Sequence, residues 1–398
     1  MEANKFHFAK LERFNSPRLS YKERMEGKYV KSGDDNQFPK HLIELYNLSS
    51  IHAAAVNATV EAIVGGGLTA DPEHALDRAN SHGETWNDIF SKVSYDYYIH
   101  GSYAIEVIWS MDRSRIAEVY HIDFSKIRAR EKTHRGLIPG YYISDDWKRY
   151  AGVKMEDIEY LPIFNPENKL DEPNQIYVFR TYRPGQEYYP LPSYNAALQV
   201  IALDTEIDTF HLNNIRNGLA PSLAITTFTN GSSDDIKAIE QGLRANYAGA
   251  ENAGSMMYMD VADPSLKPDI TPIPSNQTDT YYTTINDLTV QKILTAHRIT
   301  SPMMLGIKTE GQLGGRDEVV DAFLLWGNTV IAPLQQDVLR GLEALLEVNY
   351  PEIVIGVQTK QLYDDGTVEE EIVTSVEVTE QEDQELNEQV DDNNISNI

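Results

Sequence analysis

One short stretch of the chain combines the residue types expected of a light, non-catalytic contact with a moving or variable partner. Residues 301–315 hold Lys308, one proline (Pro302) and four glycines, and Arg316 follows directly. A structureless run of about 15 residues between helices inside a domain is usually functional or disordered. We interpret Lys308 and Arg316 as functional cations rather than ordinary solvated charges, because the helices predicted on both sides fix where the loop projects.

The residue types that carry catalysis or bind metals form no recognisable set. The chain has no cysteine, and its ten histidines are scattered without a ligand-like spacing. Asp145 and Asp146 are sequence neighbours, which usually point apart, so a solvated turn explains them. Residues 65–67 are three glycines that close a helix, and no Lys-Ser/Thr pair follows as in a phosphate loop. We therefore expect no enzyme activity, no cofactor and no metal.

Two long helices of nearly equal length must position the loop. Residues 193–216 carry an apolar stripe that includes Val200 and Ile207, and residues 277–300 carry one that ends at His297. On that stripe, His297 is interpreted as a packed or interface residue rather than a ligand. Strands at 222–228 and 255–259 and a helix at 232–247 are predicted between the long helices. Two rods that flank a small α/β module form a stalk with a head.

The rest of the chain is predicted to form an α+β domain. A third long helix starts after Gly315 and should be kinked by Pro333, and a strand at 352–357 returns to the main domain. Residues 1–48 are polar and are interpreted as an N-terminal arm. Helices are predicted at 51–64 and 85–99, and strands at 103–108, 117–122, 127–129, 140–143 and 176–182.

The charge of the chain is strongly acidic and unevenly distributed. The net charge is -27, and residues 361–398 contribute thirteen acidic residues and no Lys or Arg. This tail is expected to be disordered or weakly ordered. An acidic body disfavours tight, sequence-independent binding of nucleic acid, although it does not exclude a protein through which nucleic acid passes. With no signal-peptide pattern and no apolar run of membrane-spanning length, we expect a soluble protein that is not exported by its own signal.

The order of these elements and five local phrases resemble the portal proteins of tailed bacteriophages, close to the HK97-type portal family. Each phrase is weak alone, but their order over roughly residues 40–357 is specific. The phrases are HIDFSKIR at 121–128, IYVFRTYRPGQEYYPLPSY at 176–194, FHLNNIRNGLAPSL at 210–223, ITSPMMLG at 299–306 and NTVIAPL at 328–334.

The resemblance implies a portal-like α+β fold in which two long stem helices flank a small clip. The implied segments are an N-terminal arm (1–48), the first part of the wing (49–192), stem helix 1 (193–218), the clip (219–276), stem helix 2 (277–300), the tunnel loop (301–315), the kinked helix with the wing return strand (316–357), and an acidic tail (358–398). One departure from the family pattern is that this tail is poorly patterned. A conventional helical crown is therefore not expected, and the tail is interpreted as disordered or as a reduced crown.

The resemblance also implies a function and its partners. Such proteins form a ring of about twelve copies at one capsid vertex. Double-stranded DNA passes through the ring, which contacts the major capsid protein, terminase and head–tail adaptor proteins. The implied DNA-channel residues are Lys308, Thr309, Gln312 and Arg316 in the tunnel loop, with Lys292 and Arg298 on the stem as weaker candidates. The alternative is an adaptor or scaffold component of a virion that binds protein partners and never DNA.

Overall fold

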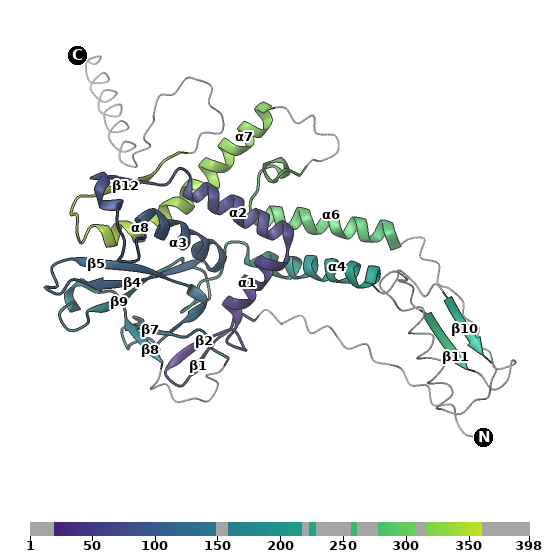
Figure 1. Ribbon diagram of the computed structural model, residues 1–398, viewed down its shortest axis with the longest axis horizontal. Helices are drawn as coiled ribbons and strands as arrows, with labels where there is room; N and C mark the ends of the chain where they lie inside the picture. Colours follow the sequence, from purple (N-terminus) through teal and green to yellow (C-terminus); the bar gives the residue numbers. More distant parts are fainter. Residues whose placement is uncertain are drawn as a thin grey trace, which may run out of the picture.

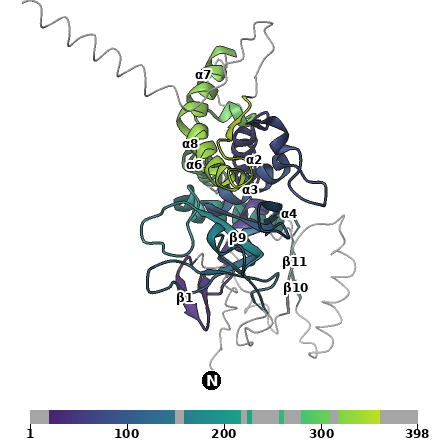
Figure 2. The ribbon, with the colours of Figure 1, turned by 90° about the vertical axis from the view of Figure 1, so that its left-hand side faces the viewer.

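The computed structural model describes residues 20–148, 158–216, 223–227, 256–260, 278–307 and 316–359. A body of sheets and helices carries a stalk of two antiparallel helices, α4 and α6, which lie side by side (Figure 1). Figure 2 shows α2, α3, α6 and α8 gathered on one side of the strands of the body, with α7 directed away from it. The α+β class predicted from the sequence is confirmed.

The described residues of the body form two three-stranded antiparallel sheets and two antiparallel strand pairs. The first sheet has the order β5-β4-β9 and the second β6-β7-β8, while β1 pairs with β2 and β12 with β3. The strands are β1 (Glu23–Glu26), β2 (Tyr29–Ser32), β3 (Leu68–Asp71), β4 (Ser102–Trp109), β5 (Ile116–Ile122), β6 (Ile127–Ala129), β7 (Gly140–Ile143), β8 (Glu159–Pro162), β9 (Asn174–Arg180) and β12 (Val354–Val357). The pairing of β12 with β3 confirms that the last strand returns to the main domain.

Capping residues determine where the helices α2 and α3 of the body begin and end. Ser49 accepts a hydrogen bond from the backbone N–H of His52 at the start of α2, and Gly65 ends that helix. Thr85 and Asp88 form a capping box on α3, which Gly101 ends in the left-handed conformation. The helices are α1 (Phe38–Leu48), α2 (Ser50–Val64), α3 (Trp86–His100), α7 (Arg316–Trp326) and α8 (Ala332–Leu346), with short 3-10 turns at Glu73–Leu76, Phe124–Lys126 and Pro166–Asn168.

The stretch assigned to an N-terminal arm contains secondary structure in its described part. Residues 20–48 form β1, β2 and α1, and α1 packs against α2, α3 and α4. Phe38, Leu42 and Leu45 are spaced at i, i+4 and i+7 and are all buried. The interpretation of this stretch as an arm is therefore corrected. The sequence did not indicate the helix, because its apolar face has only three residues and begins at Phe38-Pro39, where the proline is typical of a turn.

The stalk consists of α4 (Leu198–Arg216) and α6 (Thr278–Ala296), and α4 is preceded by a 3-10 turn at Asn195–Ala197. The α-helix of stem helix 1 begins at Leu198, five residues after the predicted 193, and α6 ends four residues before the predicted 300. Arg298 adopts a positive φ of 56°, which the α-helix cannot accommodate. Beyond the stalk, β10 (Leu223–Thr227) and β11 (Met256–Asp260) pair in parallel. The predicted helix at 232–247 lies outside the described residues.

The third long helix is divided into three parts. Between α7 and α8, residues Gly327–Ile331 form a π-helical segment, in which the N–H of Ala332 donates to the carbonyl of Gly327. The irregularity therefore falls just before Pro333 rather than at it. A proline ring would collide with the carbonyl four residues earlier in a regular α-helix, and the wider π turn relieves that collision.

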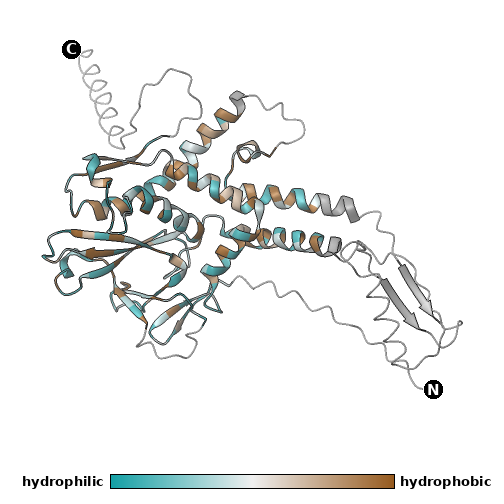
Figure 3. Cartoon of the chain, viewed as in Figure 1, coloured by the Kyte–Doolittle hydropathy of each residue, from teal (hydrophilic) through white to brown (hydrophobic). Residues whose placement is uncertain are grey.

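The core is continuous between the sheets and the helices. Its largest cluster joins α3, β4 and α8, with fully buried residues such as Phe90, Ile105 and Leu342. A second cluster joins α1, α2 and α3 to the roots of the stalk through Ile201 of α4 and Ile293 of α6. Along the rest of the stalk, apolar and polar positions alternate (Figure 3). The stalk is thus packed into the body at its base only.

Candidate functional site

The predicted tunnel loop lies mostly outside the described residues. This holds for Lys308, Thr309 and Gln312, whereas Arg316 is the first residue of α7 and only its backbone is described. The described start of the loop is a 3-10 turn, Pro302–Leu305, capped by the Ser301 side chain and ended by Gly306 at a φ of 75°. The structure therefore defines where the loop leaves α6 and where it enters α7.

Two hydrogen bonds tie the segment after α6 to the helix after the loop. The hydroxyl of Thr300 donates to the carbonyl of Ala322 at 2.8 Å, and Arg298 Nη2 donates to the carbonyl of Thr329 at 3.2 Å. The carbonyl of residue 329 would accept from the N–H of residue 333 in a regular α-helix, and Pro333 has no N–H. The Arg298 guanidinium thus supplies the donor that Pro333 lacks, a role that the sequence did not suggest.

The exposed face of the stalk carries few charges. On α6, Lys292 and Asp287 are exposed beside uncharged polar residues such as Gln291, and on α4 Asp208 is exposed. Lys292 and Arg298 are both accessible to solvent, but they belong to different surroundings. Lys292 projects from a regular helix, whereas one nitrogen of Arg298 is held by the Thr329 carbonyl. The structure does not bring these two residues into a shared cluster with the described loop ends.

The root of the stalk holds a buried chain of neutral polar side chains. His297 Nε2 lies 2.9 Å from His52 Nδ1, and His297 Nδ1 lies 2.8 Å from the Tyr98 hydroxyl. His297 also stacks on Tyr194, with ring centroids 4.7 Å apart. Burial lowers the pKa of His52 to about 4, and burial together with His52 lowers the pKa of His297. The prediction that His297 is a packed residue is confirmed.

A second polar contact fixes α4 to the same place. The Ser49 hydroxyl donates to Asp204 Oδ2 at 2.7 Å, and both residues are buried. Burial raises the pKa of Asp204, although the Ser49 hydrogen bond opposes the rise. Ser49 therefore has two roles, because it also caps α2. Both stem helices are anchored to α2 through buried polar groups, so the base of the stalk moves with the body.

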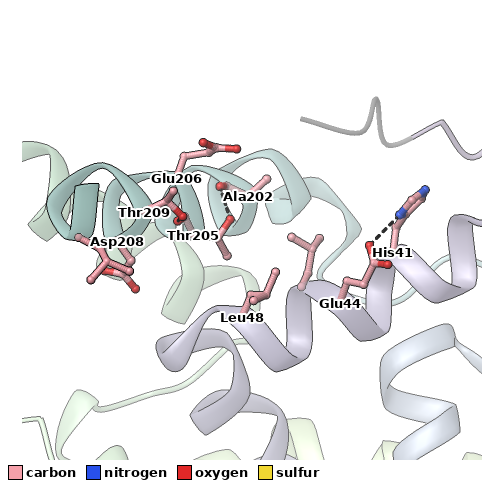
Figure 4. A pocket seen from close by; sticks show the side chains of 10 residues that line it. His41, Glu44, Leu48, Ala202, Thr205, Glu206, Asp208 and Thr209 are labelled. Carbon is pink, nitrogen blue, oxygen red and sulfur yellow. Dashed lines mark hydrogen bonds and ion pairs between the residues drawn. The ribbon is translucent and has the colours of Figure 1, made fainter. Parts of the chain in front are cut away.

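A groove of about 360 Å³ lies between α1 and α4 at the outer side of the stalk root (Figure 4). Its lining combines the apolar side chains of Leu48 and Leu212 with the acids Glu44, Glu206 and Asp208. The lining also includes His41, whose Nδ1 lies 3.0 Å from Glu44 Oε2 and whose Nε2 lies 2.7 Å from Asp35 Oδ2. Burial alone would lower the pKa of His41, but these two hydrogen-bonded carboxylates raise it. An acidic lining of this kind disfavours phosphate-bearing ligands.

Sequence reasoning missed one cluster of possible metal ligands. Asp96 and His100 of α3 and Asp123 at the end of β5 each offer a ligand atom, and these atoms lie within 4.8 Å of one another. The signal that could have found it is the i, i+4 spacing of Asp96 and His100 on one helix face. The third member, Asp123, is close only because of the tertiary fold. Asp145 and Asp146 are exposed, as the solvated-turn interpretation predicted.

A body of sheets and helices that carries a two-helix stalk and a long broken helix defines a portal-like architecture. The family model described as "Phage portal protein" matches residues 66–336 of the chain, which therefore belongs to the phage portal protein family. This is a family of structural proteins rather than enzymes. No curated protein matches the chain. Among the described residues, no helix is long and apolar enough to cross a membrane.

Solved structures show the same fold at low sequence identity. The chain is similar to a chain of the virion of a native gene transfer agent (GTA) particle, with a TM-score of 0.56, 16% identity and 94% of each chain covered. It is also similar to a chain of the neck of a native GTA particle computed with C12 symmetry, with a TM-score of 0.50, 16% identity and 80% and 83% coverage. An HK97 family phage portal protein from Corynebacterium diphtheriae matches with a TM-score of 0.47, 12% identity and 79% and 94% coverage.

Proposed function

We propose that this protein forms a ring at one capsid vertex, through which DNA enters during packaging and leaves during ejection. The ring would also be the docking site for terminase and then for the tail or head-completion proteins. The observation that carries this proposal is the family match over residues 66–336, which includes both stem helices, α7 and the start of α8. The protein would be made in the cytoplasm of a bacterial host and would act as a virion component without catalysis.

The proposed ring contains about twelve copies. The support is the likeness to a chain of a GTA neck computed with C12 symmetry. A surface feature agrees: Leu324 and Leu325 on α7, the helix directed away from the body, are 54% and 57% exposed. A neighbouring subunit that covers these two leucines would remove their apolar surface from water.

Light scattering and electron microscopy of the purified protein test the ring. The expected result is an oligomer of about twelve subunits with an open central channel. A protein that stays monomeric at high concentration would contradict the ring. A closed assembly without a channel would favour the alternative function, that of an adaptor or scaffold component which never contacts DNA.

We propose that the channel touches DNA sparsely. A ring repeats each basic residue in every subunit, so that a few cations per chain become many phosphate contacts. Each neutralised phosphate strengthens binding by counterion release, and a densely basic bore would hold the duplex in place. The exposed α6 face, with Lys292 among mostly uncharged side chains, suits a duplex that slides. The contacts we assign are Lys308, Thr309, Gln312 and Arg316 in the loop, with Lys292 and Arg298 as weaker ones on the stem.

Substitution Lys308→Glu tests the loop contact in an assembly-competent system. We expect less packaged DNA per capsid or poorer retention, because each subunit would present a carboxylate to the phosphates. Lys22→Glu is the matched control, since Lys22 is an exposed lysine of the body far from the stem in sequence. Unchanged packaging and retention in Lys308→Glu would rule out a direct DNA role for this residue.

A further inference from the structure

The side chain of His100 is buried in an arrangement that a neutral histidine rarely tolerates. The residue is 1% exposed, and neither ring nitrogen has a hydrogen-bond partner among the described residues. A buried polar atom without a partner carries a desolvation cost, so native structures satisfy nearly all of them. Here two such atoms belong to one ring. A bound cation that accepts an electron pair from imidazole would satisfy one of these two nitrogens.

Two carboxylates surround the position that this ligand would take. A ring nitrogen of His100 and carboxylate oxygens of Asp96 and Asp123 lie within 4.8 Å of one another. Ligands bound tetrahedrally at about 2.1 Å to one ion lie about 3.4 Å apart. The ligand atoms, which are here at most 4.8 Å apart, therefore need to approach one another by up to about 1.4 Å, which side-chain rotations supply. Asp123 is half-buried, so an ion can reach the site from its side.

The surroundings orient the carboxylates rather than neutralise them. Asp96 Oδ2 accepts hydrogen bonds from His121 Nε2 at 2.8 Å and from the N–H of Phe124 at 2.9 Å. The nearby Arg128 guanidinium donates only to oxygens of Asn36, Ser125 and Ile127 in its described contacts. Its positive charge works against a bound cation, but the two carboxylates outnumber it.

We propose that Asp96, His100 and Asp123 bind one divalent transition-metal ion of the zinc type. One imidazole nitrogen with two carboxylate oxygens is a ligand set for such ions, while Mg²⁺ and Ca²⁺ prefer oxygen alone. His121 acts as a positioning residue that holds Asp96, as hydrogen-bonded partners of metal ligands commonly do. The ion would join the end of α3 to the β5 corner.

The test uses the full-length assembled protein after removal of metals with a chelator. We titrate it with Zn²⁺ by calorimetry and with Co²⁺ by visible absorption. The expected result is saturable binding of one ion per chain, a cobalt spectrum with nitrogen and oxygen ligation, and a rise in the thermal midpoint with ion concentration. No saturable binding would overturn the proposal.

Variants separate a metal ligand from a packing residue. His100→Phe removes both ring nitrogens and should abolish metal binding. Because it keeps an aromatic ring in the same place, its thermal midpoint without metal should stay at or above that of the parent protein. Asp123→Asn, at a half-buried position, should weaken binding and serves if His100→Phe fails to fold. His121→Gln should lower the affinity about 10- to 100-fold without changing the stoichiometry. His134→Phe, at an exposed histidine, is the matched control and should bind as the parent does. Parent-like binding by both His100→Phe and Asp123→Asn would overturn the site.

Discussion

The buried histidines at the stalk root form a chain with Tyr98 that can run in either direction. Either the Tyr98 hydroxyl donates to His297 Nδ1 and the Nε2–H of His297 donates to His52 Nδ1, or both hydrogen bonds run the other way. Both rings are neutral in these two arrangements, and protonation of both rings would place two N–H groups face to face. This makes the stalk root sensitive to acid in a way that its apolar neighbours are not.

We predict that the protein loses stability as the pH falls from about 6.5 towards about 4. Burial depresses the folded-state pKa of His52 to about 4 and also lowers that of His297, so the unfolded chain binds protons first. Their contribution is complete above the unfolded pKa of about 6.5 and is lost below it at up to about 1.4 kcal/mol per pH unit for each histidine. Thermal unfolding followed over this pH range measures the slope.

His52→Phe separates this effect from the protonation of carboxylates. The variant should be less stable at neutral pH, because it leaves His297 Nε2 without its hydrogen-bond partner, but its stability should fall less steeply with acid. His134→Phe, at an exposed histidine, should keep the slope of the parent. Equal slopes for His52→Phe and the parent would show that the buried pair does not carry the pH dependence.

Among the elements, α8 approaches the strands so closely that only glycine fits at the contact. A Cβ on Gly341 would overlap the hydroxyl of Tyr103 and lie 2.9 Å from Tyr177 Cε1. That Tyr103 hydroxyl donates to the carbonyl of Val338 at 2.8 Å, so it cannot move without breaking a buried hydrogen bond. Gly341 thus sets the distance between α8 and the β5-β4-β9 sheet.

We predict that Gly341→Ala destabilises the protein by about 1–3 kcal/mol, although alanine is the better helix former. Gly327→Ala is the matched control, because nothing lies within 4 Å of a Cβ at that position. It should be neutral or mildly stabilising. Denaturant unfolding of the two variants against the parent makes the comparison, and a smaller loss for Gly341→Ala than for Gly327→Ala would contradict the packing argument.

The link between Arg298 and the broken helix gives a second prediction at this scale. Arg298→Ala should lower stability by about 0.5–1 kcal/mol, because the Thr329 carbonyl is exposed and water partly replaces the guanidinium. In a Pro333→Ala background the same change should cost less, since the N–H of residue 333 can then reach that carbonyl. A double-mutant cycle measures this coupling. Lys292→Ala, at another exposed basic residue, is the control, and its effect on the free energy of unfolding should simply add to that of Pro333→Ala. If the effects of Arg298→Ala and Pro333→Ala are also additive, the proposed link does not exist.

The elements differ in how far the sequence predicts them. The stem helices and α3 were predicted from long apolar stripes with clear boundary residues, and strands such as Gly140–Ile143 agree with their predicted bounds. The strand β8 was missed because its sequence, EYLP, has one buried apolar residue and ends in proline, which is not typical of a strand. The Arg298–Thr329 bond could not be predicted, since it depends on a backbone carbonyl freed by a proline in another helix. The Asp96–His100–Asp123 cluster needs a tertiary contact that spacing alone does not reveal.

For the whole molecule, charge and shape support the same proposal. A net charge of -27 repels a free duplex, while the stalk carries only a few exposed charges of either sign. Both stem helices are fixed at the root by buried polar contacts through α2, so a ring of such stalks would be rigid at its base. A rigid, sparsely charged channel in an acidic ring would let DNA pass without binding it tightly.

This balance predicts that added positive charge on the stem slows DNA movement. Gln291→Lys places a second cation next to the exposed Lys292 of α6, and assembly into a ring multiplies it. We expect the assembled protein to bind labelled duplex more tightly. The slope of the logarithm of the binding constant against the logarithm of the salt concentration should become more negative by about 0.9 for each phosphate newly contacted. Virions carrying the variant should eject DNA more slowly. Gln336→Lys adds the same charge at an exposed position of α8 and should leave both measurements unchanged. If the two lysines act equally, net charge rather than the stem face controls DNA passage, and the assignment of α6 to the channel fails.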